Sequence, residues 1–152
     1  MSDTLSNRAA RFAAAYALLR AAADVADHWV QSDHQARNKG QHDHNDGQSS
    51  AAGRRACAAH VATYTATQAG ALLAGSHVLG VRLRPGPVVA ALALSAVTHY
   101  VADRREPLRR LADATGKSNF VRLADFGMNG AYALDQAWHH AFETAAAVIA
   151  SV

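Results

Sequence analysis

Residues 88–103 have the sequence VVAALALSAVTHYVAD, and residues 133–147 have the sequence ALDQAWHHAFETAAA. Both stretches are rich in alanine, the best helix former, and neither alternates apolar and polar residues as a half-buried strand does. Each carries an aspartate and a histidine four positions apart, which lie on one face of a helix: His99 with Asp103, and Asp135 with His139. The two stretches therefore predict helices that place Asp–His pairs inside an apolar bundle.

The composition of the whole chain agrees with a helical fold. The chain has 152 residues, enough for one domain with a substantial core, and half of them are hydrophobic. Alanine is the commonest apolar residue and aromatic residues make up only 7%, which favours closely packed helices over a β-sandwich. We expect an all-α fold in which residues 1–152 form a single-domain bundle of four to five helices, with a His/Asp cluster between helices.

Apolar spacing and turn residues divide the chain into segments. Apolar positions three and four apart predict one long helix over 4–39, and the polar, glycine-flanked stretch 40–53 predicts a mobile loop. Another helix over 54–77 ends at a proline-containing turn over 80–87. Further helices are expected over 88–105, over 107–115 with Gly116 as a C-terminal cap, and over 130–152 after an irregular passage.

Two more residues extend the cluster to four helices. On the first helix, Asp27 falls within about 60° of the apolar stripe, whereas Asp24 and His28 fall outside it. His60 lies in a segment without charged residues. Because a buried carboxylate is costly unless it is paired or metal-bound, we expect one or two divalent cations, zinc or else manganese, with these ligands: Asp27, His60, His99, Asp103, Asp135 and His139. A metal-free Asp–His hydrogen-bond network is the alternative.

The same motifs carry a family resemblance. The runs DHWVQSDHQARNK (27–39), the isolated His60, THYVAD (98–103) and DQAWH (135–139) follow one another in this order. Together they resemble a family of small bacterial and phage-encoded helical proteins, often predicted to be membrane-embedded, and more distantly a group of membrane-bound metal-dependent hydrolases. The resemblance spans about residues 23–142.

The resemblance implies a His/Asp metal centre in a helical bundle, with further matched positions at Gln31, Lys39 and Gln136. The related sequences have a histidine where this chain has Ala23. That difference implies a changed metal count, replacement of the ligand by Asp24 or His28, or a descendant of the family that binds a ligand without catalysis.

These residues predict a metal-dependent hydrolase of a small-molecule or lipid phosphoester. Asp27 and Asp103 are the expected catalytic residues, because a carboxylate that is not needed as a ligand can act as base toward a metal-bound water. Arginines near Asp103 would neutralise phosphate, and the two glutamines would orient the substrate or the ligands, although a surface role fits them equally. The candidate substrate contacts are Gln31, Lys39, Arg104 and Gln136.

Other classes of function stay open. The first alternative is a non-catalytic helical module, either membrane-associated or phage-related. Such a module would use the Asp–His network to stabilise the bundle or a partner interface. The net charge of +3 and the paired arginines make nucleic-acid binding a weaker alternative. The 26 residues between Arg55 and Arg82 carry no charge and are long enough to span a bilayer, but they are rich in alanine and glycine. Since no signal peptide is evident, we expect a cytoplasmic bundle, either soluble or membrane-associated.

Several other motifs predict no site. The run TGKS (115–118) ends like a phosphate-binding loop, but Leu111 occupies the position of its first glycine. The single cysteine, Cys57, lies in an apolar stretch and is interpreted as a core residue. His42 and His44 lie in the polar loop, and His140 points about 100° away from His139 on a helix.

Overall fold

The computed structural model describes residues 2–124 and 127–152. These two ranges contain α-helices and connecting segments, and no strand. Five helices have nine residues or more: α1 (Ser2–Val25), α3 (Ser50–Val78), α4 (Pro85–Asp103), α5 (Glu106–Ala114) and α7 (Gly130–Ala150). Two are shorter: α2 (Asp33–Asn38) and α6 (Ser118–Val121). The predicted all-α bundle of four to five helices is confirmed.

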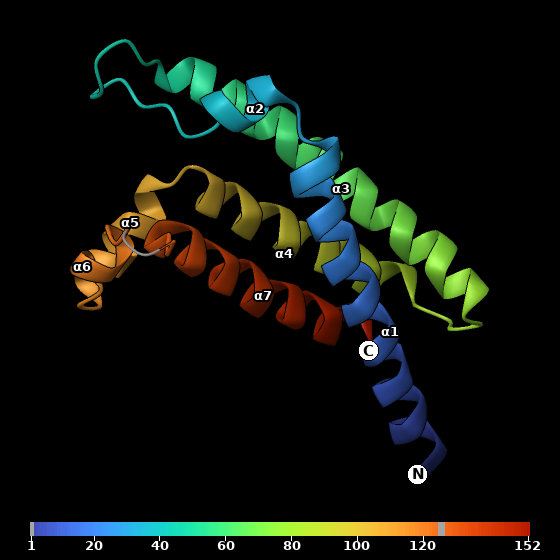
Figure 1. Cartoon of the computed structure of the whole chain (residues 1–152). Helices are drawn as coiled ribbons and strands as arrows, with labels where there is room; N and C mark the ends of the chain where they lie inside the picture. The colour runs from blue at the N-terminus through green and yellow to red at the C-terminus, as the bar shows by residue number, and fades with distance from the viewer. Residues whose placement is uncertain (1, 125–126) are drawn as a thin grey trace.

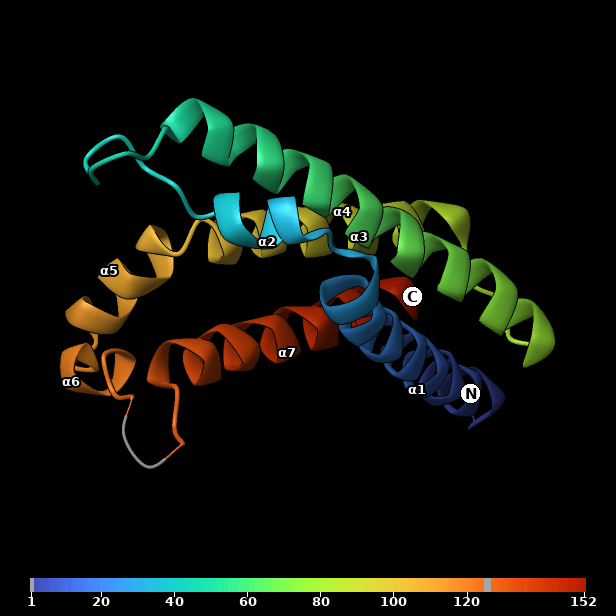
Figure 2. The ribbon, with the colours of Figure 1, turned by 45° about the horizontal axis from the view of Figure 1, so that its top comes forward.

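Four long helices form the body of the bundle (Figure 1). The helix α4 packs along α7 and also against α3, and α1 packs against both α3 and α7. The short helices α5 and α6 lie at the same end of the molecule as the loop between α2 and α3 and the start of α7 (Figure 2). Segments distant in sequence therefore meet at this end.

The core consists mainly of small residues. One buried cluster joins α1, α3, α4 and α7, and its members are Ala15, Leu19, Leu72, Ala91, Ala146, Ala147 and Ala150. Small side chains let the helix backbones approach closely and still pack densely. At Gly75 of α3 the approach is so close that a Cβ would collide with Leu18 of α1. The alanine-rich composition is thus expressed as close helix packing.

The predicted single helix over 4–39 is wrong, because Gln31 and Ser32 separate two helical stretches in this region. The helix α1 passes into a π-helical turn, η1 (Ala26–Val30), and α2 begins after Ser32. Ser32 is extended (φ −78°, ψ 155°) and forms a capping box with Gln35. Its hydroxyl accepts the Gln35 N–H at 3.3 Å, while the Gln35 side-chain oxygen accepts the Ser32 N–H at 2.9 Å. The apolar stripe of the first helix ends at Val30, and the stretch 31–39 contains Ala36 as its single apolar residue, so periodicity does not support a helix that continues to Lys39.

The other boundaries differ by a few residues from those predicted. The helix α3 begins at Ser50, inside the predicted loop 40–53, where Ser49 caps it by accepting the Ala52 N–H at 3.3 Å. The helix α4 begins at Pro85 because proline suits the first turn of a helix. Gly116 has φ 73° after α5, consistent with the predicted cap. The passage 117–129, predicted to be irregular, contains α6.

One helix of the described residues is long and apolar enough to cross a membrane. It is α4, whose best window has a mean hydropathy of 1.3. The charge-free segment between Arg55 and Arg82, which the sequence indicates as the possible span, lies largely in α3 and does not reach this hydropathy.

Candidate metal centre

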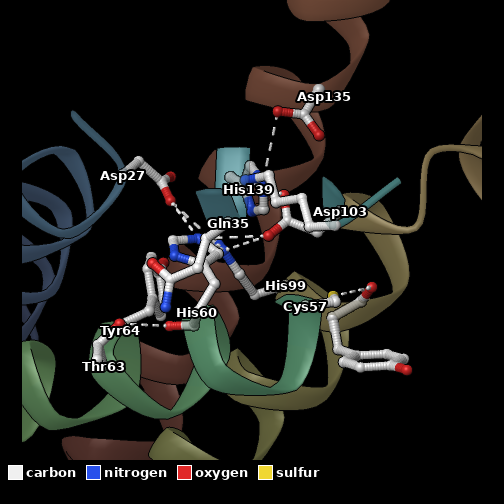
Figure 3. A network of polar contacts seen from close by, with 12 residues as sticks. Asp27, Gln35, Cys57, His60, Thr63, Tyr64, His99, Asp103, Asp135 and His139 are labelled. Carbon is white, nitrogen blue, oxygen red and sulfur yellow. Dashed lines mark hydrogen bonds and ion pairs between the residues drawn. The ribbon is translucent and has the colours of Figure 1, made fainter. Parts of the chain in front are cut away.

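All six predicted metal ligands lie in one contiguous cluster. The turn η1 carries Asp27, α3 carries His60, α4 carries His99 and Asp103, and α7 carries Asp135 and His139. Three histidines and Asp103 are each at most 5% exposed. In Figure 3, Asp27, His60, His99, Asp103 and His139 converge, whereas Asp135 lies beyond His139.

The imidazoles of His60 and His99 form the centre of the cluster. Their Nε2 atoms lie 2.9 Å apart. Asp27 Oδ1 lies 3.1 Å from Nε2 of His60 and 3.4 Å from Nε2 of His99. Asp103 Oδ2 lies 3.3 Å and 3.1 Å from the same two nitrogens. The two nitrogens therefore form an edge shared by two triangles, each closed by a carboxylate.

One hydrogen bond from each imidazole to a carboxylate does not use all of these short contacts. Each Nε2 carries at most one proton, yet it faces the other Nε2 and two carboxylate oxygens within 3.4 Å. If both nitrogens were protonated, each N–H could donate to one carboxylate, but two donor nitrogens would then lie 2.9 Å apart. If only one were protonated, the lone pair of the other would face two carboxylates. A cation among these atoms accepts all of the lone pairs at once.

The spacing of the donor atoms matches that of ligands around a small divalent cation. For ligand distances of about 2.0–2.1 Å, two ligands of a tetrahedral ion lie about 3.3 Å apart. The edges of both triangles measure 2.9–3.4 Å. Imidazole and carboxylate ligands suit zinc and manganese. Each triangle supplies three protein ligands, the number that leaves a position for water in catalytic zinc sites.

The helix α7 places a second group of donors beside the first. Ligand atoms of His99, Asp103 and His139 lie within 4.8 Å of one another, so these residues could also hold an ion. The rings of His99 and His139 are 4.4 Å apart, and His139 Nε2 lies 3.5 Å from Asp135 Oδ2. Burial by itself lowers the pKa of His139, but Asp135, Asp27 and Asp103 outweigh burial and raise it. The carboxylates on η1, α4 and α7 therefore all favour the protonated form of His139.

Lys39 provides a positive charge at the edge of the cluster. Its Nζ lies 2.7 Å from Asp103 Oδ1, the carboxylate oxygen that does not contact the histidines. Burial by itself raises the pKa of Asp103, but the hydrogen bond and charge of His99, together with Lys39, hold that pKa well below its usual range. The pKa of Asp27 is likewise raised by burial but lowered overall by His60, His99 and Lys39. Both carboxylates are therefore ionised at neutral pH, as metal ligands must be.

The π-helical turn brings Asp27 into the cluster. The turn is closed by a hydrogen bond of 2.9 Å from the Gln31 N–H to the Ala26 carbonyl. As the helical angle predicts, Asp24 and His28 are exposed, and Asp27 is the acidic residue of this region that contacts the histidines. Turns with an inserted residue of this kind are frequent at functional sites.

A layer of polar residues not predicted from the sequence lies one helical turn away from the candidate histidine ligands. The Tyr64 ring stacks on His99 with centroids 3.8 Å apart. Its hydroxyl donates to Glu143 Oε1 at 3.0 Å and accepts from Gln68 Nε2 at 3.1 Å. Ser95 Oγ donates to Gln68 Oε1 at 2.8 Å. The layer therefore links α3, α4 and α7 directly beneath the candidate ligands.

The sequence contains a signal for this layer. Tyr64, Ser95 and Glu143 each lie four positions from a candidate histidine ligand, one turn along the same helix face. Glu143 is 2% exposed, and its Oε2 accepts from Arg20 of α1 at 2.8 Å. Burial raises the pKa of Glu143, and the hydrogen bonds from Arg20 and Tyr64 offset part of this rise.

The four predicted substrate contacts occupy two kinds of position. Gln31, Lys39 and Gln136 line the cavity beside the cluster. The amide Nε2 of Gln31 is buried and has no hydrogen-bond partner among the described residues. Arg104 is buried, and its guanidinium donates to the backbone carbonyls of Lys39 and Gln41. Its side chain is therefore engaged in holding the segment that follows α2.

The cavity beside the cluster has a volume of about 640 Å³. Asp27, Asp103, Asp135 and His139 contribute to its lining. Permanently charged cations also line it, namely Lys39 and three arginines: Arg105, Arg109 and Arg122. Cavities of this volume accommodate small-molecule ligands. Four of the six candidate ligands are thus accessible from the cavity, whereas His60 and His99 lie behind them and do not line it.

The remaining histidine and cysteine candidates are less suited to chemistry. Cys57 is buried, and burial raises the pKa of its thiol to about 12, in keeping with a core residue. His42, His44 and Glu106 come within 4.8 Å of one another. However, His42 Nε2 already lies 2.9 Å from the carbonyl oxygen of Arg104, and His44 is exposed.

Comparisons with known proteins give no match, whether to a protein-family model, to a curated protein or to a solved structure. The family resemblance inferred from the motifs therefore stays a prediction, and the proposals below rest on the residues of this chain.

Proposed function

We propose that this protein is a metal-dependent hydrolase of a phosphoester-type substrate. The supporting observation is the pair of Nε2 atoms of His60 and His99, 2.9 Å apart and each within 3.4 Å of two carboxylates. This set of atoms fits a divalent cation, which would accept all of these lone pairs at once. A divalent ion bound there would lower the pKa of a bound water and polarise a phosphoryl oxygen.

The residues of the cluster divide the remaining tasks. His60, His99 and one of the two carboxylates hold the ion. The other carboxylate, Asp27 or Asp103, accepts a proton from the attacking water. Lys39 keeps Asp103 ionised and lines the cavity, where its ammonium can contact a phosphoryl oxygen.

The cavity supports a phosphoester as the substrate. Lys39 and three arginines line it together with the candidate ligands. Proteins use these two residue types to bind phosphate, arginine by paired hydrogen bonds and lysine as a point charge. Lys39 and Arg122 already pair with Asp103 and Asp113, so Arg105 and Arg109 are the two lining cations that a charged substrate would neutralise.

The proposal is tested by measuring metal content and hydrolysis in the same samples. Elemental mass spectrometry should find near-stoichiometric zinc or manganese in the wild type, and none in His99→Ala. Hydrolysis of p-nitrophenyl phosphate and bis-p-nitrophenyl phosphate should be lost with the metal. His140→Ala is the matched control, because His140 is exposed and adjoins His139 outside the cluster. A folded wild-type protein that contains no metal and takes up neither added zinc nor added manganese would refute the proposal.

A non-catalytic bundle is the second candidate, and the buried layer around Tyr64 favours it. That layer joins four helices by hydrogen bonds, so the cluster above it would act as a structural element. The exposed valines of α4, Val89 (66%) and Val97 (63%), would then suit a partner or a membrane surface. Metal that raises the melting temperature without hydrolysis of any phosphoester in a broad panel would support this candidate instead.

A further inference from the structure

We infer that the cavity binds a second phosphate group of the substrate on an arginine wall formed by Arg105 and Arg109. The inference rests on the proposed phosphoester hydrolysis and narrows its substrate. The substrate would be an organic molecule with two phosphate groups, one at the His/Asp cluster and the other at the arginine wall.

The backbone holds the two arginines on the same side of α5. They are four positions apart, and the Arg109 N–H donates to the Arg105 carbonyl at 3.0 Å. Both line the same cavity as Asp103 and Asp135. The arginine wall and the candidate ligands therefore face one space.

A strained turn connects the wall to the cluster. Arg105 has φ 59° and ψ −47°, and the Glu106 N–H donates to the Arg104 carbonyl at 2.6 Å across it. This is a γ-turn with positive φ, a rare and costly conformation for a residue with a side chain. Only Arg104 separates Arg105 from Asp103. The turn therefore fixes the position of the arginine wall relative to a candidate metal ligand. Strain of this kind is concentrated at ligand-binding and active sites.

Charge is distributed unevenly along the cavity. Three of the lining carboxylates belong to the metal cluster: Asp27, Asp103 and Asp135. The fourth, Glu106, pairs with Arg110 at 2.8 Å. Among the side chains of residues 7–124 and 127–152, no ion pair joins Arg105 or Arg109 to a carboxylate, and the Arg105 guanidinium has one long contact, 3.4 Å to the carbonyl oxygen of Ala36. The arginine end of the cavity is therefore positive, which favours an anion.

Two further observations point to a ligand larger than one phosphate. Gln31 contributes a buried amide Nε2 that lacks a partner among the described residues, a donor suited to a substrate oxygen. The volume of about 640 Å³ lies in the range of sites for whole organic ligands. A substrate with two phosphates has room for an organic part between the wall and the cluster.

The test compares ligands that differ by one phosphate, titrated calorimetrically into the metal-loaded full chain. Adenosine 3′,5′-bisphosphate is paired with adenosine 5′-monophosphate, and fructose 1,6-bisphosphate with fructose 6-phosphate. At least one bisphosphate should bind about tenfold more tightly than its monophosphate, because a charge-assisted hydrogen bond is gained. The pair that shows the gain tells whether the organic part is a nucleoside or a sugar.

Arg109→Ala should remove this tenfold gain and leave the affinity for the monophosphate within about twofold. Arg110→Ala is the matched control, since Arg110 is the next residue of α5, its side chain is 76% exposed and it does not line the cavity. Equal affinities for the members of both pairs, or equal effects of the two variants, would overturn the inference.

Metal content measured in the same samples separates this inference from the proposed function. A metal-loaded wild type without the bisphosphate gain contradicts the arginine wall and leaves the proposed metal centre intact. A metal-free wild type whose bisphosphate gain still depends on Arg109 contradicts the metal-dependent hydrolase and supports the wall.

Discussion

The substitution Tyr64→Phe should destabilise the protein through hydrogen bonds alone. Tyr64 is 1% exposed, and its hydroxyl donates to Glu143 at 3.0 Å and accepts from Gln68 at 3.1 Å. Phenylalanine keeps the ring that stacks on His99 and packs against Ala23 and Ala26. The substitution therefore removes both hydrogen bonds without leaving a cavity.

The size of the effect follows from the two partners. A hydrogen bond to a charged group contributes about 1.5–3 kcal/mol, and one between neutral groups contributes about 1 kcal/mol. We expect the free energy of unfolding to fall by about 2–4 kcal/mol, which corresponds to a fall in melting temperature of about 5–15 °C in a protein of this length.

The loss should depend on pH, because Glu143 titrates. Burial raises the pKa of Glu143, and the Tyr64 hydrogen bond counteracts part of that rise. An acid with a raised folded-state pKa favours the folded state most when protonated, and this contribution is lost as the pH rises through that pKa. The hydroxyl stabilises the ionised form, so its removal raises the pKa further. The difference between wild type and variant should therefore be larger at about pH 8 than at about pH 5.

The measurement is urea unfolding followed by circular dichroism, with EDTA present so that metal binding does not contribute. Tyr132→Phe is the control, because Tyr132 is 51% exposed and its substitution should change the unfolding free energy by less than about 0.5 kcal/mol. A loss below about 0.5 kcal/mol for Tyr64→Phe, or an equal loss at both pH values, would refute the reasoning.

Two further predictions concern the region between α1 and α2. Asp27→Asn should weaken zinc or manganese binding at least about tenfold in a competition assay with a chromophoric chelator, because a charged ligand is lost. Asp24→Asn, three residues earlier and paired with Arg20 on the surface, should leave metal affinity unchanged, and equal effects of the two would contradict a ligand role for Asp27. Ser32→Ala removes the capping box of α2 and should lower the unfolding free energy by about 1 kcal/mol in urea. An unchanged urea midpoint would show that the cap does not stabilise the fold.

The local spacing of residues is sufficient to predict the main helices and part of the His/Asp cluster. His99 and Asp103 share a face of α4 because any α-helix brings residues four apart together. The helical angle also distinguishes Asp27 from Asp24, although the chain around Asp27 is a π-helical turn. The break at Ser32 has two signals that the predicted helix over 4–39 overlooked: apolar periodicity ends at Val30, and the Ser-x-x-Gln spacing is that of a capping box.

The four-residue spacing rule could also have predicted the polar layer next to the ligands. Tyr64 and Glu143 follow candidate histidines by four residues, but each alone resembles an ordinary core aromatic or an interruption of an apolar helix. Their hydrogen bond joins residues 79 positions apart, so it exists only once α3 and α7 pack together.

By itself, the sequence determined the helical class, the main helices and the polar residues that share a face with a neighbour one turn away, because these depend on interactions between nearby residues. The tertiary structure alone decided that the Nε2 atoms of His60 and His99, 39 positions apart, lie at 2.9 Å. It also decided that the Arg104 guanidinium donates to the carbonyls of Lys39 and Gln41, whereas Arg105 lines the cavity and has one longer contact, 3.4 Å to the carbonyl of Ala36. Both outcomes depend on how alanine-rich faces pack and on the path of one strained turn, and local periodicity carries no information about the distance between helices.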